Sequence, residues 1–185
     1  KAVHDGTEYG FGRLSNSLTL CCDCLGEIHY FNSSGISFDG SVEVIENAIC
    51  LHEEDYGIQW KHNDGMGAPN EVRRSRRLVI SSISTIGNYD YGLFWYLYLD
   101  GTIEAEVKLT GIVGISAYNE DKHNPNQDLR ISKELVSPVH QHLFCMRLDW
   151  NLDGGNNQLF ESEIELMPDD DNNLSLIHIS EPTRR

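Results

Sequence analysis

Two histidines separated by a single residue are the clearest candidate for metal chemistry in this sequence. His140 and His142 flank Gln141, and because successive side chains of a strand alternate between its two faces, both imidazoles would point to the same side. Imidazole nitrogens are ligands that suit copper, zinc and iron. The spacing therefore indicates a transition-metal site if the segment is a strand, although a pair of surface histidines has the same spacing.

Two further motifs carry groups that could take part in catalysis, but both are also typical of turns. Tyr89 stands between Asn88 and Asp90 in a strand-rich region, where such a motif usually forms a turn beside a core tyrosine. Asp5 opens the run Asp5-Gly6-Thr7-Glu8-Tyr9 and by itself is a carboxylate in a turn. Neither motif indicates catalysis by itself, and both do so only in combination with the histidine pair.

The cysteines leave two interpretations open. There are five of them, at positions 21, 22, 24, 50 and 145, and an odd number leaves at least one thiol unpaired within a monomer. A zinc knuckle could use Cys22, Cys24, Cys50 and His52. Each pair is separated by one residue, however, whereas the usual zinc ribbon separates its ligands by two.

The charge balance argues against nucleic-acid binding. The chain has 29 acidic residues against 14 Lys and Arg, a formal net charge of −15, whereas non-specific binding depends on cationic side chains that displace counterions. The one basic run, Arg73-Arg74-Ser75-Arg76-Arg77, is expected to be a solvated or ion-paired turn. The acidic run His52-Glu53-Glu54-Asp55 is likewise expected to be a structural turn rather than a metal cluster.

Neither a membrane span nor a targeting segment can be identified. No stretch approaches the roughly 20 apolar residues that cross a bilayer. Because Lys1 is not a natural start, the chain is expected to be a fragment whose compartment the sequence leaves open. Asp149 opens a run that begins like an EF-hand loop, but its twelfth position is Phe160 rather than the required bidentate glutamate, which excludes an EF-hand.

Short strands separated by turn residues dominate the pattern. Four strands are predicted, over residues 78–83, 94–99, 103–107 and 144–148. Asp100-Gly101 predicts a tight hairpin between two of them, and Asp39-Gly40 and Asn63-Asp64-Gly65 predict further turns. Residues 118–135 are polar and are expected to form a long loop. No window holds a helical period, so the sequence predicts an all-β antiparallel sandwich built of meanders.

The last residues differ in character from the rest. Residues 174–185 match the conceptual translation of a transposase adapter used in preparing sequencing libraries, and we expect them to be an artefact outside the fold. His178 is then meaningless as a ligand. The authentic part of the chain is expected to be residues 1–173.

Several motifs in order make the chain resemble the catalytic domain of the copper amine oxidases. The resemblance runs from Lys1 to about Glu165, includes the Thr85-Ile86-Gly87-Asn88-Tyr89-Asp90 motif and closes with His140-Gln141-His142. The other matching segments are Ser15–Leu18, Cys22–Tyr30, Asn47–Asp55, Arg73–Ile80 and Leu99–Lys108. The resemblance implies part of a large antiparallel β-sandwich in a primary-amine oxidase.

The resemblance also implies two cofactors and their sites. Tyr89 matches the tyrosine that copper and oxygen convert into topaquinone, and Asn88 and Asp90 match the neighbours that orient its ring. His140 and His142 match two of the three copper ligands, and the third is expected beyond the end of this chain.

Asp5 matches the catalytic base of the family. In the mechanism that the resemblance implies, a primary amine forms a Schiff base with the quinone, and Asp5 removes the α-proton. Burial is expected to shift the pKa of this carboxylate toward neutrality. Hydrolysis releases the aldehyde, and reoxidation by oxygen gives hydrogen peroxide and ammonia.

Further features follow from the resemblance alone. Cys24 and Cys50 match a family disulfide, which is favoured over the zinc knuckle, and Asp149 matches one ligand of a peripheral calcium site whose other ligands are mostly absent. Relatives are homodimers, some secreted and some peroxisomal. Val3 and His4 stand where many relatives carry an aromatic gate and its neighbour, so the substrate preference is left open.

Two functions are therefore weighed against each other. One is a copper- and topaquinone-dependent oxidase whose isolated fragment is expected to be inactive. The other is a non-catalytic β-sandwich binding or structural module derived from the same family. Asp5, Tyr89, His140 and His142 favour the oxidase, because a retired enzyme has no chemical reason to keep all four.

Overall fold

The computed structural model describes residues 5–65, 67 and 70–162. The chain divides into two compact units, Lys1–His140 and Gln141–Arg185. All of the regular structure in the described residues lies in the first unit and is nearly all strand, so the predicted all-β class is confirmed. No helix among the described residues is long and apolar enough to cross a membrane.

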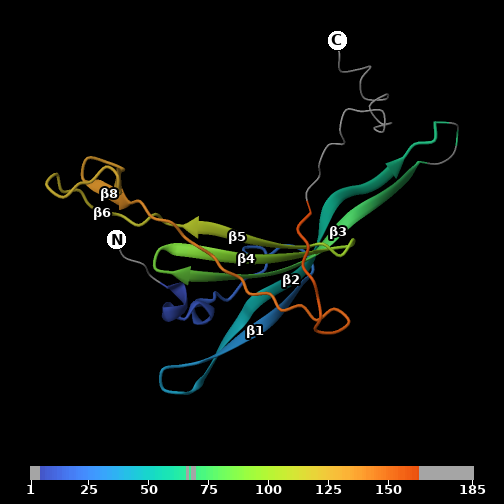
Figure 1. Ribbon diagram of the computed structural model, residues 1–185, viewed down its shortest axis with the longest axis horizontal. Coiled ribbons are helices and arrows are strands. Elements are labelled where there is room, and N and C mark those ends of the chain that lie inside the picture. Colours follow the sequence, from blue (N-terminus) through green and yellow to red (C-terminus); the bar gives the residue numbers. More distant parts are fainter. Residues whose placement is uncertain (1–4, 66, 68–69, 163–185) are drawn as a thin grey trace, which may run out of the picture. The chain divides into compact units, whose positions relative to one another are not determined.

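A five-stranded antiparallel meander forms the larger sheet (Figure 1). Its strands follow one another in chain order: β1 (Ile28–Ile36), β2 (Val42–His62), β3 (Glu71–Ile86), β4 (Tyr89–Tyr98) and β5 (Ile103–Gly111). Each strand pairs with the next one along the chain, so sequence neighbours become sheet neighbours. Three of the four predicted strands lie within or mostly within β3, β4 and β5.

Glycine-containing turns make these reversals possible. Gly40, between β1 and β2, has a φ of 84°, and Gly101, between β4 and β5, has a φ of 87°. Both values lie in the left-handed region, which glycine enters without steric cost. At the second turn the Thr102 amide also donates to the Asp100 carboxylate at 2.9 Å. The predicted Asp-Gly turns are therefore confirmed.

The basic and the acidic run were both wrongly predicted to be turns. They lie opposite each other in the middle of the long strands β2 and β3, with Glu54 paired to Arg77 and Glu53 to Leu78 in the register. Arg74, Arg76 and Arg77 bond to acidic side chains of β2, whereas Arg73 bonds to Glu71 of its own strand. Cross-strand pairing satisfies both runs, which is why ion pairing was predicted correctly although the turn was not.

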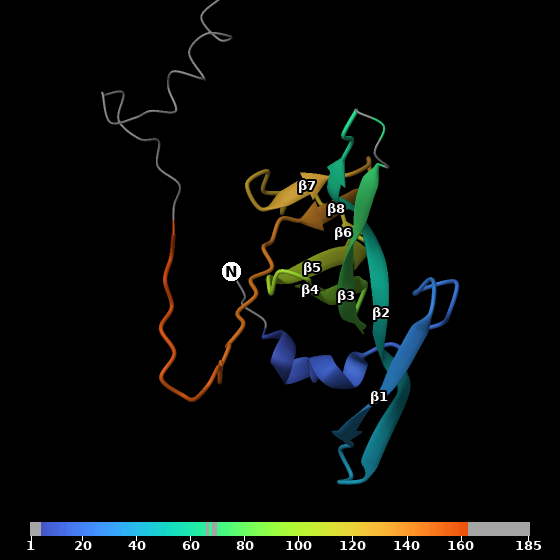
Figure 2. The same ribbon diagram turned by 90° about the vertical axis from the view of Figure 1, so that its right-hand side faces the viewer.

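Smaller elements complete the first unit. Two 3₁₀ helices, η1 (Gly6–Tyr9) and η2 (Phe11–Leu14), precede the sheet, and η2 lies against β1 and β3 (Figure 2). A second, three-stranded sheet has the order β6 (Ser116–Ala117), β8 (Leu135–Pro138) and β7 (Asp128–Arg130). The predicted long loop at 118–135 is thus interrupted by the short strand β7.

The buried core of the larger sheet is small. Leu18, Cys24 and Cys50 form one buried cluster, against which Tyr30 and Ile83 pack. Of the large side chains described, Val79 and Cys50 are less than 2% exposed.

The second unit differs from its prediction. Residues 144–148 were expected to form a strand, but they are irregular and most are exposed. A strand requires a neighbour for its backbone hydrogen bonds, and the described part of this unit contains no strand that could supply one. Alternating apolar residues were therefore not sufficient to predict a strand at this position.

Candidate active site around Tyr89

Tyr89 is the first residue of β4, immediately after the tight turn at Gly87 and Asn88. Gly87 has a φ of 61°, and this left-handed conformation lets β3 reverse directly into β4, so that Ile86 pairs with Tyr89 in the register. On its other side Tyr89 pairs with Gly111 at the end of β5. The half-buried ring therefore starts from a backbone held by two neighbouring strands.

A chain of polar side chains holds the residue after Tyr89. The Thr85 hydroxyl donates to the Asp90 carboxylate at 2.5 Å and accepts from the Asn16 amide at 3.0 Å. Asn16 is positioned in turn because its backbone N–H donates to the Ile83 carbonyl at 2.7 Å. A segment far upstream thus fixes Asp90 through one hydroxyl, and hydrogen bonds to a charged acceptor are the stronger kind.

The segment after β5 holds the motif from the other side. The Ile112 amide donates to the carbonyl of Asn88 at 2.7 Å, and the Gly114 amide donates to the Tyr89 hydroxyl at 3.1 Å. Sequence reasoning missed the roles of Asn16 and Gly114. Asn16 lies in the matching segment Ser15–Leu18, to which the sequence assigned no role. Gly114 acts through its backbone amide, which no side chain reveals in the sequence.

His140 lies beside Tyr89, with the two ring centroids 5.5 Å apart. Its Nδ1 donates to the Pro138 carbonyl at 2.8 Å. This bond places the proton on Nδ1 and the ring's lone pair on Nε2, and a second bond of this kind is what orients metal-binding histidines. The donor set at this point therefore fits one imidazole ligand of a metal next to a phenol.

The predicted strand geometry of the histidine pair is wrong. Both residues follow β8, which ends at Pro138, and neither lies in a strand. His140 closes the first unit and the half-buried His142 belongs to the second. The described residues contain no group of three His, Cys, Asp or Glu side chains that could hold a metal ion.

Asp5 directly precedes η1, where its carbonyl accepts from the Glu8 amide at 3.1 Å. A side chain on the neighbouring Gly6 would meet Ile86 at 3.9 Å, so η1 begins close to the end of β3 that leads into the Tyr89 turn. The Asp5 side chain is nevertheless exposed. The burial expected for this carboxylate is therefore not provided by the residues that the structure describes.

In the described residues the cysteines form neither the zinc knuckle nor the Cys24–Cys50 disulfide that the sequence suggested. Cys24 and Cys50 are buried in the same cluster, but both are free thiols, as are Cys21, Cys22 and Cys145. Burial, followed by a hydrogen bond and the charge of Cys24, raises the pKa of the Cys50 thiol to about 12. The described residues also contain no group of three His, Cys, Asp or Glu side chains that could hold a zinc ion.

Asp149 is exposed in the second unit. The Asn157 amide donates to the carbonyl oxygens of Trp150 and Gly154 at 2.8 and 2.9 Å. Two backbone oxygens of this loop thus point at an amide rather than at a cation. The described residues therefore give no support to the calcium site expected at Asp149.

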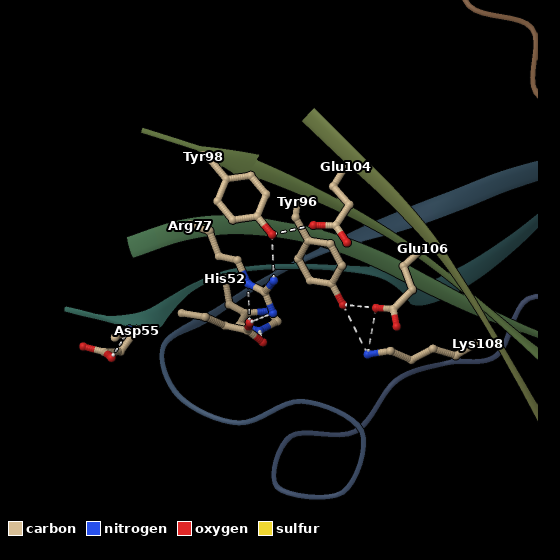
Figure 3. A network of polar contacts seen from close by, with 10 residues as sticks. His52, Asp55, Arg77, Tyr96, Tyr98, Glu104, Glu106 and Lys108 are labelled. Carbon is tan, nitrogen blue, oxygen red and sulfur yellow. Dashed lines mark hydrogen bonds and ion pairs between the residues drawn. The ribbon is translucent and has the colours of Figure 1, made fainter. Parts of the chain in front are cut away.

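A second polar cluster surrounds Arg77 and spans β2 to β5 (Figure 3). The guanidinium donates to Glu54 at 2.9 and 3.0 Å and to the Tyr98 hydroxyl at 3.0 Å, and it lies 3.9 Å from the Tyr96 ring centre. Burial opposes ionisation of Glu54, but bonds from Arg77 and His52 outweigh it and lower its pKa. This cage of aromatic and acidic groups is filled by the chain's own cation, which indicates a structural role.

Two cavities lie away from the Tyr89 motif. The larger, of about 370 Å³, lies between η2 and the β1–β2 hairpin and is lined by Phe11, Arg13 and Glu43 among others. The smaller, of about 180 Å³, lies beside the three-stranded sheet near His123 and Asp128. Neither cavity is lined by Asp5, Tyr89 or His140.

Comparisons with known proteins agree on one protein family. A model of the copper amine oxidase enzyme domain matches residues 1–183. A primary amine oxidase of Arthrobacter sp. strain P1 is 47% identical over 165 residues, which cover 89% of this chain and 26% of that protein. A histamine oxidase of Arthrobacter globiformis is 49% identical over 168 residues, covering 89% and 24%. The chain thus spans about a quarter of the length of these relatives.

A solved structure resembles the fold as well as the sequence. The copper-containing benzylamine oxidase from Hansenula polymorpha aligns with a TM-score of 0.60 and 32% sequence identity. The alignment covers 69% of this chain and 20% of that one. The fold of this chain is therefore similar to part of that structure.

Proposed function

This chain belongs to the copper amine oxidase family, and we propose that the full protein containing it is a primary-amine oxidase. The reaction converts a primary amine, oxygen and water into an aldehyde, ammonia and hydrogen peroxide. Relatives named primary amine oxidase and histamine oxidase support primary amines as the substrate class. The nature of the substrate side chain stays open.

In this proposal Tyr89 is the precursor of topaquinone, and His140 and His142 are two of three copper ligands. The copper and the quinone supply the oxidising power that takes two electrons from the amine and passes them to oxygen. His140 presents Nε2 because the Pro138 carbonyl holds the proton on Nδ1. A third histidine outside this chain would complete the set.

The remaining roles belong to side chains around the motif. Asp5 takes the proton from the carbon that bears the amine, which general-base catalysis requires of a nearby carboxylate. Asn88 and Asp90 orient the Tyr89 ring through the backbone on either side of it. Asp90 is suited to this role because the Thr85 hydroxyl holds its carboxylate at 2.5 Å.

The single observation that carries the proposal is the approach of Tyr89 to His140. Their ring centroids are 5.5 Å apart although they come from different parts of the first unit, the start of β4 and the segment after β8. A metal on His140 would therefore lie close to the phenol that must be oxidised. An ordinary core tyrosine has no need of this neighbour.

Two finer features of the full protein are also proposed. Cys24 and Cys50 share one buried cluster, and we propose that they form a disulfide under oxidising conditions. Mass spectrometry of peptides from the unreduced full-length protein would detect the cross-link, and alkylation of both thiols would contradict it. We also propose a homodimer, as in the family that the chain resembles, which light scattering on the full-length protein would check.

The deciding experiment uses the full-length protein expressed in copper-supplemented medium and treated with phenylhydrazine. A quinone-hydrazone absorption band is expected, and the Tyr89→Phe protein should lack it. The Tyr56→Phe protein is a matched control, because it also loses one hydroxyl but from β2, and it should keep the band. No band from the unsubstituted protein, folded and with copper bound, would overturn the proposal and favour the non-catalytic module.

A further inference from the structure

The segment that leaves β5 passes over the hydroxyl of Tyr89. Gly114 donates its backbone N–H to this hydroxyl at 3.1 Å. Two residues earlier, the Ile112 amide donates to the carbonyl of Asn88 at 2.7 Å. The same short segment therefore holds both the backbone next to Tyr89 and the far end of its side chain.

Gly114 also leaves space that any other residue would fill. A Cβ atom at this position would stand 3.0 Å from the Tyr89 hydroxyl oxygen and 3.8 Å from the ring carbon that carries it. The φ of Gly114 lies outside the positive region that disfavours side chains, so the backbone itself would accept alanine. The phenol, not the backbone, is what alanine would crowd.

Gly111 makes the contrast clear. Its φ is 103°, and a Cβ there would collide with the Asn88 carbonyl and stand 2.9 Å from the Asp90 amide. Glycine is thus needed at 111 because of its left-handed backbone conformation and the neighbouring backbone atoms. At position 114 a side chain would instead crowd one hydroxyl group, that of Tyr89.

We infer that Gly114 is a positioning residue for Tyr89, fixing the hydroxyl through its amide and leaving it room through the absent side chain. The inference rests on the proposed function, in which the ring must keep one orientation beside His140. Two contacts bear on that orientation: the Gly114 amide at the hydroxyl, and the His140 ring at 5.5 Å from the Tyr89 ring. Because Tyr89 is only half-buried, packing alone would hold it less firmly.

The first test needs neither copper nor activity. In the metal-free full-length protein, Gly114→Ala should lower the urea midpoint of unfolding, and it should lower it much less when Tyr89→Phe is also present. The crowded oxygen is then gone, and neighbouring substitutions that share a contact are non-additive. Gly155→Ala is the control, since a Cβ there meets nothing within 4 Å, and it should shift the midpoint equally with and without Tyr89→Phe.

Each outcome of this double-mutant cycle either supports or contradicts the role inferred for Gly114. Equal shifts for Gly114→Ala in both backgrounds would overturn the inference, because the strain would then lie elsewhere. A Gly114→Ala protein that fails to fold but is rescued by Tyr89→Phe would support it in stronger form. Failure to fold in both backgrounds would count against it.

The second test follows formation of the cofactor. When copper and oxygen are added to the full-length metal-free protein, Gly114→Ala should slow the conversion of Tyr89 by about fivefold or more. The new methyl group would push the hydroxyl away from the backbone amide at 114, and fivefold is the factor that the loss of one hydrogen bond of about 1 kcal/mol represents. The readouts are the mass of the peptide containing Tyr89, and the copper content, which should not change. Unaltered conversion in Gly114→Ala would overturn only this inference, whereas no conversion in the unsubstituted protein would overturn the proposed function.

Discussion

At the scale of single residues, the Tyr89 motif is held by groups from three separate segments of the chain. Asn16 comes from the segment before β1, Thr85 from the end of β3 and Gly114 from the segment after β5. Asn16 bonds to Thr85, Thr85 bonds in turn to Asp90, and Gly114 bonds to the Tyr89 hydroxyl. Their combined effect is to restrict both the backbone and the ring at one point of the sheet.

Thr85 is the residue through which Asn16 reaches Asp90. Thr85→Val keeps the shape of the side chain but leaves the Asn16 amide and the Asp90 carboxylate without this partner, and we expect a loss of about 1–3 kcal/mol in the free energy of unfolding. Urea denaturation of the full-length protein would measure it. Thr85→Ser retains the hydroxyl and should lose clearly less; equal losses for the two variants would mean that packing of the methyl group matters more than the hydroxyl.

At the scale of elements, the ladder of ion pairs between β2 and β3 keeps the two long strands in register. Arg74 pairs with Asp55, Arg76 with Glu53 and Arg77 with Glu54. The first two pairs are exposed, and exposed ion pairs contribute little to stability. Opposite charges placed across the ladder therefore select the register more than they stabilise the sheet, since a slip by one residue would send the side chains to the other face.

Asp55 offers a direct titration test of this ladder. Hydrogen bonds from Arg74 and from the Gly57 amide lower its pKa from 3.8 to about 2. Because the folded-state pKa is the lower one, the stabilisation is fully present above about pH 4 and is lost as the pH falls toward 2. In a carboxyl NMR titration, Arg74→Gln should move the midpoint toward 3.8.

The control for this titration is Arg73→Gln. Arg73 is equally basic but bonds to Glu71 instead of Asp55, so its replacement should leave the Asp55 midpoint nearly unchanged. An Asp55 that titrates at its ordinary value in the unsubstituted protein would show that the pair with Arg74 does not persist in solution.

At the scale of the whole molecule, apolar side chains remain exposed on strands β2 and β5 of the larger sheet. Ile103 and Leu109 on β5 are 43% and 52% exposed, and Val42 and Val44 on β2 are 72% and 53% exposed. In the described residues β5 is also an edge strand with one unpaired side. Open edges with apolar faces are templates for pairing with another chain.

The 185-residue chain expressed alone is therefore expected to self-associate. Its formal charge of −15 opposes association, and because salt screens that repulsion, light scattering should report a larger mass at high salt than at low salt. Ile103→Lys together with Leu109→Lys on the β5 edge should reduce the effect. A monomer of 21.0 kDa at both salt concentrations would contradict this expectation.

Local sequence patterns correctly predicted those strands that have a neighbouring strand to pair with in the tertiary structure. Alternation and Asp-Gly turns predicted β4, β5 and the hairpin between them, because each of these pairs with its neighbour along the chain. The same reasoning failed for residues 144–148, where the described part of the second unit contains no strand to pair with. It also failed for the basic and acidic runs, whose charges suggested turns but which neutralise each other across β2 and β3.

By itself the sequence determined the family, the all-β class and the residues of the motif, because these depend on residue types and their order along the chain. Only the tertiary structure decided how the motif is held: the bond from Gly114 to Tyr89, the relay from Asn16 through Thr85, and the place of the His140 ring beside the phenol. Those contacts join segments far apart in the chain, and no local pattern encodes the distance between two atoms that folding brings together.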